Sequence, residues 1–204
     1  HKRKNSIAIG IAVRDILGLA KNLREAKHIL NSGAVAVDGR IVRDYRFPVG
    51  LFDLVTVLPE KRAYRAVFNK RGQVVFREEK LGKQEKLCRI ASKRAIKKGM
   101  IQLQTNDGRA FKMKKTDARV GDTLLVTVPE QKVLKHFKLA PGAIAFVAAG
   151  ARIGALAEVK RITEGTMRRP KLVVLSAEGK EFQTVVDNVF VVGEKKPAIA
   201  VKGE

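Results

Sequence analysis

The 204-residue chain is poor in cysteine, histidine and aromatic residues. Its single cysteine, Cys88, excludes a disulfide framework and fits a reducing, intracellular environment. Three histidines and one cysteine are too few for a zinc finger. Tryptophan is absent and aromatic residues make up only 5 %, so rings that stack on unpaired bases are not expected to dominate any binding surface.

Long hydrophobic runs are also lacking. The longest apolar stretch, residues 140–151, has about 12 residues and ends at Arg152, whereas a membrane-spanning helix needs about 20. The N-terminal residues show no apolar run followed by a small-residue cleavage site, so no signal peptide is expected. No amphipathic basic helix with bulky aromatics is present either, so a membrane is not expected as a partner.

Basic residues, in contrast, are in large excess. The chain has 42 Lys+Arg against 20 Asp+Glu, a net charge of +22, while 45 % of its residues are hydrophobic, as in a folded protein. The excess is uneven, because residues 61–119 carry +14 while residues 1–58 carry +5 and residues 120–204 carry +4. Such a chain needs a polyanionic partner, and nucleic acid recognised by phosphate contact and shape fits best.

The first sixty residues predict two helices and a hairpin. Residues 6–20 place their apolar side chains on one stripe of a helix, with Ser6 as the expected N-cap. Residues 22–31 predict a second helix, since Asn22 is a good N-cap, Glu25 stands three residues later, and Gly33 can end it. The polar face of this second helix can follow a phosphate backbone, although an ordinary solvated face is the alternative; its residues are Arg24, Lys27, His28 and Asn31.

A hairpin and a further strand come next. Residues 34–37 and 40–43 are predicted strands around Asp38-Gly39, a strong two-residue turn, and residues 54–57 predict another strand. Residues 59–62 are polar and predict a linker. Residues 1–58 are therefore expected to fold alone.

These segments resemble the S4-type RNA-binding module. The resemblance rests on Arg24-Glu25-Ala26, Ile29-Leu30, Asn31-Ser32-Gly33, and residues 35–40 and 49–53. It implies that the two helices and the loop after them form an RNA-binding surface. Enzymes and ribosomal proteins both carry such modules, so the module alone does not set the function.

The remaining chain predicts short strands. They are expected at residues 63–68, 73–76, 100–105, 109–113 and 123–128, and then at 144–147, 171–175, 182–186 and 188–193. Residues 77–86 predict a loop with a helical turn, residues 97–99 a turn, and residues 87–96 fit a helix or a strand equally well. Many short strands with frequent turns favour small barrels or compact sheets.

A glycine-containing stretch near the start of the last third of the chain resembles the KOW motif, a strand–loop–strand piece of small barrels that often contact RNA. Residues 149–159 are expected to continue the strand before them, with a sharp bend at Gly150 and Gly154. Ala157 stands where many such motifs have glycine.

The order of these three parts resembles the ribosomal protein S4e family. Further matches are Lys86-Leu87-Cys88-Arg89, Val120-Gly121-Asp122-Thr123, and residues 47–53 and 188–193. The resemblance implies an α+β fold in three units: a two-helix and hairpin module (1–58), a basic central β-domain (59–135), and a KOW-like small barrel with a basic tail (136–204). It also implies a structural role in the small ribosomal subunit, in the cytoplasm.

Catalysis is not expected. S4-type modules also occur on pseudouridine synthases and tyrosyl-tRNA synthetases, but the Arg-Leu-Asp tripeptide of the first and the His-x-Gly-His and Lys-Met-Ser-Lys-Ser elements of the second are absent. Asp38, Asp44 and Asp53 lie in or beside turns, where aspartate has backbone roles. His28 has no second histidine or cysteine near it, so no metal, cofactor or small-molecule substrate is expected.

The sequence therefore predicts a scaffold whose Lys and Arg side chains neutralise phosphates of folded ribosomal RNA, with neighbouring ribosomal proteins as further partners. The alternative is a free RNA-binding factor that visits ribosomal particles during stress or assembly. Off the ribosome a monomer is expected. The candidate RNA-binding residues are Arg14, Lys21, Arg24, Lys27, His28, Asn31, Arg40, Arg43, Arg71, Lys93, Arg94, Lys97, Lys98, Lys112, Lys114, Lys115 and Arg152.

Overall fold

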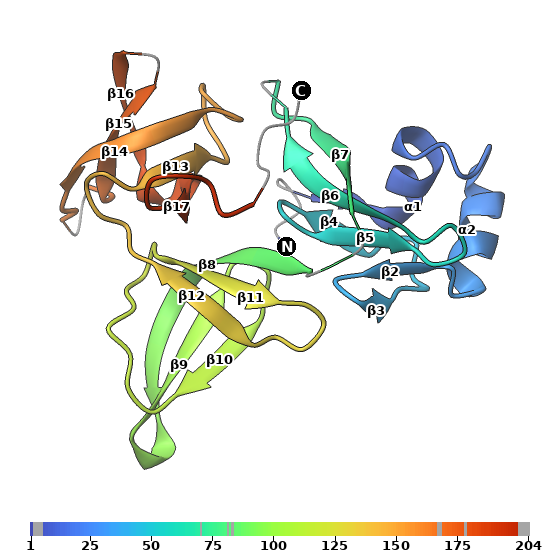
Figure 1. Ribbon diagram of the computed structural model, residues 1–204, viewed down its shortest axis with the longest axis horizontal. Helices are drawn as coiled ribbons and strands as arrows, with labels where there is room; N and C mark the ends of the chain where they lie inside the picture. The colour runs from blue at the N-terminus through green and yellow to red at the C-terminus, as the bar shows by residue number, and fades with distance from the viewer. Residues whose placement is uncertain are drawn as a thin grey trace.

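The structure, a computed structural model, describes residues 1, 6–69, 71–80, 82, 84–166, 169–177 and 179–199, with the side chain of Lys98 left out. The fold is mostly β-sheet with two short helical segments near the N-terminus, in broad agreement with the predicted α+β class. Three five-stranded sheets lie around a common centre, with the helices at the outer side of the first of them (Figure 1), and β1 and β4 form a separate two-stranded sheet. None of the helices within the described ranges has the length and apolar character that crossing a membrane requires.

The first helical segment is shorter than predicted. Ser6–Ala8 form a strand, β1, that pairs antiparallel with β4 (Pro48–Gly50), and Ile9 N donates to Phe47 O. The helix therefore begins with α1 (Ile9–Ile11) and continues as a wider, π-helical turn at Ala12–Ile16. Ser6 as N-cap is wrong, because strand pairing occupies its backbone and Ala8 takes the N-cap position. Gly18, at φ 65°, ends the segment early.

The second helix, α2 (Leu23–Asn31), forms as predicted. Asn22 Oδ1 accepts a hydrogen bond from Glu25 N at 2.9 Å, and Glu25 Oε2 accepts from Lys21 N at 2.7 Å. Ala26 and Leu30 are fully buried on the face that packs toward the first sheet. The opposite face is exposed to solvent.

The first sheet runs across the predicted boundary between residues 58 and 59. Its strand order is β3 (Arg40–Ile41), β2 (Val35–Val37), β5 (Leu54–Val57), β6 (Arg62–Phe68) and β7 (Val74–Glu79). Asp38 and Gly39 both have positive φ, 49° and 74°, as the two-residue turn requires. The interpretation of residues 59–62 as a linker is wrong. Residues 58–61 form a tight turn between the paired strands β5 and β6, and Arg62 already belongs to β6, opposite Val57.

The second sheet contains more strand than the sequence indicated. Its order is β10 (Ala110–Met113), β9 (Met100–Thr105), β8 (Glu85–Ile96), β11 (Thr123–Thr127) and β12 (Val133–Phe137). The ambiguous residues 87–96 are strand, held by β11 at one end and β9 at the other. The predicted loop at 77–86 is wrong at both ends, where β7 and β8 extend into it, and β12 was not predicted.

The third sheet is built from the last five strands of the described chain. Its order is β16 (Lys180–Val185), β15 (Leu172–Ala177), β14 (Leu156–Thr163), β13 (Ile144–Val147) and β17 (Val189–Gly193). Residues 149–159 do not simply continue β13. A loop with turns follows it, and β14 begins at Leu156 and runs back against β13. β15 and β16 pair antiparallel where the sequence predicted strands at 171–175 and 182–186, and Glu178 between them lies outside the described residues.

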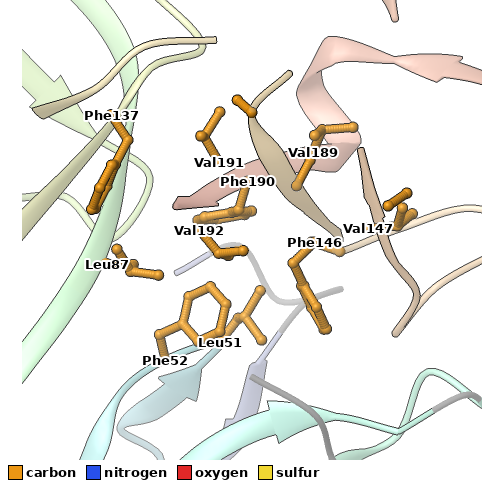
Figure 2. Packing of buried hydrophobic residues seen from close by; sticks show 14 of the residues in the cluster. Leu51, Phe52, Leu87, Phe137, Phe146, Val147, Val189, Phe190, Val191 and Val192 are labelled. Atoms are coloured by element: carbon orange, nitrogen blue, oxygen red, sulfur yellow. The ribbon is translucent and has the colours of Figure 1, made fainter. Parts of the chain in front are cut away.

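The largest hydrophobic cluster joins all three sheets (Figure 2). Phe52, from the turn before β5, lies 5.7 Å from Phe146 and 5.6 Å from Phe190 between ring centroids. Leu87 and Phe137 of the second sheet contribute to the same cluster. Burial of each of these side chains stabilises the folded state by roughly 1.5–3 kcal/mol. Because they come from all three five-stranded sheets, their packing fixes the sheets against one another.

Candidate nucleic-acid interface

A buried ion cluster, here called the junction, lies where the first and second sheets meet. Lys86 on β8 is 1 % exposed, and its Nζ lies 2.7 Å from Asp38 Oδ2, 2.6 Å from Asp53 Oδ1 and 2.8 Å from Asp107 Oδ2. Asp38 and Asp53 come from turns of the first sheet, while Asp107 lies in the turn between β9 and β10. One lysine therefore ties two separately formed sheets together.

Further partners saturate the three carboxylates of the junction. Arg109 places Nη2 2.6 Å from Asp38 Oδ2 and Nε 3.0 Å from Asp107 Oδ2, and His1 Nε2 lies 2.9 Å from Asp53 Oδ1. The remaining oxygens accept hydrogen bonds from Leu54 N, Gly50 N and Thr105 Oγ1. Buried charges with this many partners hold a structure in one arrangement rather than react.

The pKa values in the junction follow from burial and an excess of carboxylates over cations. Burial raises the pKa of Asp38 and Asp53, and for Asp38 the charge of Asp53 adds to the effect. Burial alone would lower the pKa of Lys86, but the three carboxylates outweigh it and hold the ammonium protonated. Burial opposes ionisation of Asp107 as well, yet contact with Lys86 keeps its pKa below the ordinary value.

No reactive group emerges from the junction. Cys88, on β8, is fully buried beside it, and burial raises the pKa of its thiol. Among the described residues no three His, Cys, Asp or Glu side chains are placed to hold a metal ion. The junction was missed at the sequence level, because Lys86, Asp107 and Arg109 look like ordinary surface residues until the sheets are docked.

The basic stripe on α2 is exposed, as the sequence suggested. Arg24, Lys27, His28 and Asn31 all face solvent. Lys27 Nζ lies 4.3 Å from the centroid of the Tyr45 ring, and the Arg46 guanidinium lies 5.2 Å from the same centroid. The stripe thus continues through an aromatic ring onto the loop after β3.

The other candidate residues within the first 58 positions differ in exposure and in the groups that they contact. Arg14 is half-buried and binds Asp15 through two hydrogen bonds of 2.5 and 2.7 Å, so its charge is locally neutralised. Arg43 lies beside the end of α2, because its Nη2 is 3.9 Å from where a Cβ on Gly33 would stand. Arg40 and Arg43 line a cleft of about 640 Å³ that opens next to the junction. Lys21, just before α2, is exposed.

The candidate residues of the second sheet and of the loop after β10 include both exposed side chains and one that supports the structure. Arg94, Lys97, Lys112, Lys114 and Lys115 are exposed. Lys93 is exposed too, but its Nζ donates to Ala118 O at 2.9 Å and Thr116 O at 3.2 Å, so it braces the loop after β10. The side chain of Lys98 lies outside the described residues.

Two predicted residues from distant parts of the chain lie near each other. Arg71 stands in the turn between β6 and β7, and Arg152 in the loop between β13 and β14. These two segments touch, since a Cβ on Gly72 would lie 3.2 Å from Ile153 Cδ1. Arg152 stacks on Phe182, 4.8 Å from the ring centroid. In Figure 1 this region, α2 and the end of the second sheet point in different directions, so the candidates form three surfaces rather than one.

We expect the α2 stripe to contribute to RNA binding without contributing to the core. The combined change Arg24→Ala, Lys27→Ala and His28→Ala should weaken binding to structured RNA in a filter-binding assay. Its free energy of unfolding should fall by only about 1 kcal/mol, since surface changes cost about 0.5 kcal/mol and the Lys27–Tyr45 contact is worth about 0.5–1 kcal/mol.

Leu30→Ala is the matched control on the buried face of α2. It should lower the free energy of unfolding by about 2–5 kcal/mol, because Leu30 is fully buried and its loss opens a cavity. Unchanged RNA affinity in the triple variant would make the stripe an ordinary solvated face.

Comparison with known proteins places these features in a family. Residues 60–133 match the family described as "Ribosomal family S4e", and residues 15–55 match the S4 domain. The chain is 35 % identical to the small ribosomal subunit protein eS4 of Methanocaldococcus jannaschii, over 98 % of this chain and 84 % of that protein. It is 37 % identical to the eS4 protein of Methanothermobacter thermautotrophicus, over 100 % of this chain and 84 % of that protein.

A solved structure agrees with the sequence matches. The crystal structure of the 30S ribosomal protein S4e from Thermoplasma acidophilum superposes with a TM-score of 0.80 at 32 % identity, covering 93 % of this chain and 96 % of that one. Identity of this size over nearly the whole length, with the same fold, leaves one assignment: the chain belongs to the S4e family of ribosomal proteins.

Proposed function

We propose that the chain is a structural constituent of the small ribosomal subunit, in the cytoplasm, that binds ribosomal RNA by phosphate contact and shape and so supports translation. The names of its relatives and the match to an S4 domain support this assignment. The chain then acts as a scaffold. Its sheets fix the spacing of basic side chains, and those side chains neutralise phosphates where RNA segments converge.

One structural observation carries this proposal, namely that the basic side chains of α2 and of the second sheet are exposed while several aspartates are held inside by groups of the chain. Asp38, Asp53, Asp107 and Asp122 each have less than a tenth of the side chain exposed and are bonded to groups of the chain itself. The basic side chains of α2 and of the second sheet remain at the surface. Lys86 and the largely buried Arg109 lie with three of these carboxylates, so their charges largely cancel, and the exposed basic side chains are the ones available to phosphates.

Partners other than RNA follow from the same role. We expect neighbouring ribosomal proteins to contact the chain in the subunit, and the free chain to be a monomer. Six of the eight large exposed hydrophobic side chains among the described residues lie within residues 11–58; the eight are Ile11, Ile16, Leu23, Ile41, Phe47, Leu58, Val120 and Leu134. Nothing in the proposed role requires a cofactor or a small-molecule substrate.

Binding to structured RNA should fall steeply with salt. If about six phosphates are neutralised, log K against log [salt] should have a slope of roughly −4 to −5 for RNA that combines single- and double-stranded segments. This expectation rests on the net charge of +22. Titration of the full chain with small-subunit ribosomal RNA at several salt concentrations measures the slope, and a slope near zero would contradict the electrostatic account.

A washing experiment separates a structural constituent from a visiting factor. A constituent remains with purified small subunits through a high-salt wash, because many of its contacts are buried in the particle. A free assembly or stress factor leaves with the wash. Quantitative detection of the chain in the pellet and supernatant decides between the two.

A further inference from the structure

The second sheet extends beyond the body of the protein as a three-stranded projection, here called the arm. β11 pairs with Glu85–Arg89 of β8 and not with residues 92–96. Residues 92–96 pair with β9 along one edge, and β9 pairs in turn with β10, so these three strands form the arm. In Figure 1 the turn between β8 and β9 is the part of the second sheet farthest from the other two sheets. One face of the arm is accessible to solvent, as the exposure of Arg94, Gln104 and Lys112 shows.

The two faces of the arm differ in composition. Its inner face carries Leu103 and Phe111, which are buried with Ile90 and Leu124 in a hydrophobic cluster. Its outer face is mostly polar and solvent-accessible, in rows set by the strand register: Arg94 opposite Gln102 opposite Lys112, and Ser92 opposite Gln104 opposite Ala110. An apolar pair, Ile96 opposite Met100, lies on the same face at the tip. Ser92 Oγ and Gln104 Oε1 lie 3.4 Å apart, which confirms that this row shares one face.

Within the described ranges, the two basic side chains of the outer face, Arg94 and Lys112, are not neutralised by an acidic partner. No hydrogen bond or ion pair within the described ranges engages the side chains of Arg94 or Lys112, whereas Lys93, on the inner face, is held by two carbonyls. From residue 86 to residue 116 the sequence contains one acidic residue, Asp107, and that carboxylate is 2 % exposed in the junction. Cations without counter-charges on a projecting surface favour a polyanionic partner.

The form of the partner follows from what surrounds these cations. The outer face has no aromatic side chain, so it offers no ring on which an unpaired base could stack. It offers instead two glutamines and a serine, which can donate to and accept from ribose 2′-hydroxyls and base edges. The two cations, Arg94 and Lys112, lie on either side of Gln102, about 10 Å apart across the sheet. The wide, shallow minor groove of an RNA duplex displays these groups to a surface of this kind.

We infer that the outer face of the arm binds double-helical RNA across its minor groove, with Arg94 and Lys112 on phosphates and Gln102 and Gln104 on ribose hydroxyls. This inference rests on the proposed RNA-binding function and specifies the substrate of one surface. The α2 stripe and the Arg71–Arg152 region remain free to contact other RNA segments.

The test compares charge removal on the arm with equal charge removal elsewhere. The full-length variant Arg94→Gln/Lys112→Gln is compared with Lys195→Gln/Lys196→Gln, which removes two exposed charges after β17. Binding of a short RNA duplex should weaken about tenfold or more in the arm variant, with the salt slope shallower by about two, since each phosphate contact contributes about one. The control should lose only about twofold, through the long-range field.

A second variant tests the hydroxyl contacts. Gln102→Ala/Gln104→Ala should leave the salt slope unchanged but reduce the preference for an RNA duplex over a DNA duplex of the same sequence, because only RNA has the 2′-hydroxyl. Circular dichroism and urea unfolding verify that each variant is folded. Both glutamines lie outside the buried cluster, so stability should stay close to that of the parent.

Several outcomes would overturn the inference. Equal losses in the arm and control variants would show that the arm is not a specific contact. A loss confined to single-stranded RNA, or to an acidic polymer such as polyglutamate, would identify a different occupant. An unmodified chain that binds no RNA at all would instead refute the proposed function, so the two failures are distinguishable.

Discussion

Lys86→Met is expected to lower the free energy of unfolding by about 3–5 kcal/mol, because it leaves three buried aspartates without their shared cation. Lys86 is 1 % exposed and lies within 2.8 Å of Asp38, Asp53 and Asp107. Methionine fills much of the same volume, so loss of charge rather than loss of packing causes the effect. Urea unfolding of the full chain at neutral pH measures it.

The size of this loss should depend on pH. In the variant, the three buried aspartates lose Lys86 and keep Arg109 and His1 as partners, and burial holds their pKa values above those of the unfolded chain. Proton uptake then stabilises the folded form as pH falls through those raised values. The parent behaves in the opposite way at Asp107, whose pKa Lys86 helps to hold below its ordinary value. The difference in stability between the two proteins should therefore be largest near pH 7 and should shrink toward pH 4.

Two controls separate this explanation from simple loss of a lysine. Lys112→Met, on the exposed face of β10, should change the free energy of unfolding by about 0.5 kcal/mol or less. In the Lys86→Met background, Asp53→Asn should recover part of the loss, because it removes one of the buried charges that Lys86 had neutralised. A Lys86→Met protein as stable as the parent at every pH would show that the junction does not hold the sheets together.

The locally determined elements were predictable from the sequence. Asn22 caps α2 as its spacing to Glu25 indicated, Asp38-Gly39 forms the predicted turn, and β5 has the predicted bounds. Each of these depends on residues within a few positions of one another. Side-chain capping and positive-φ turns are short-range effects that a sequence carries directly.

Elements that depend on distant partners were not predictable. Residues 6–8 have the apolar spacing of a helix, but pairing with β4, some forty residues away, holds them extended. Residues 87–96 have apolar side chains that fit either structure, and the neighbouring strands β9 and β11 decide it. Local propensity is a weak determinant where tertiary pairing competes with it.

The same distinction applies to the candidate site. Composition correctly placed most basic side chains at the surface, as for Arg24 and Arg94, because lysine and arginine are seldom buried. It could not separate these from Lys86, which is buried, or from Lys93, whose ammonium is held by two carbonyls. Nothing near Lys86 in the sequence differs from the surroundings of an exposed lysine; its three partners come from other turns.

A chain ending at residue 58 should fail to fold cooperatively, contrary to the expectation from its sequence alone. β5 would lose β6, which pairs with it over its whole length. Ala66 of β6 also accepts a backbone hydrogen bond from Phe52 N and donates one to Asp53 O, and both would be lost. Ala66 is fully buried in the cluster beneath α2, and Val74 and Phe76 of β7 pack against that cluster. Without these strands the remaining core is too small, since even complete domains of 55–65 residues are marginal.

A chain ending at residue 80 is the matched comparison, because it adds β6 and β7 and completes the first sheet. It also restores Arg65, whose Nε lies 2.6 Å from Glu79 Oε2 and whose Nη1 donates to Phe52 O at 3.2 Å. We expect the longer fragment to show a cooperative thermal transition by circular dichroism, at a lower temperature than the full chain because Phe52 loses Phe146 and Phe190. The shorter fragment should show a gradual change. A cooperative transition in both would mean that the helices and hairpin close a core without β6, and that the pairing of β5 with β6 adds stability without being required for folding.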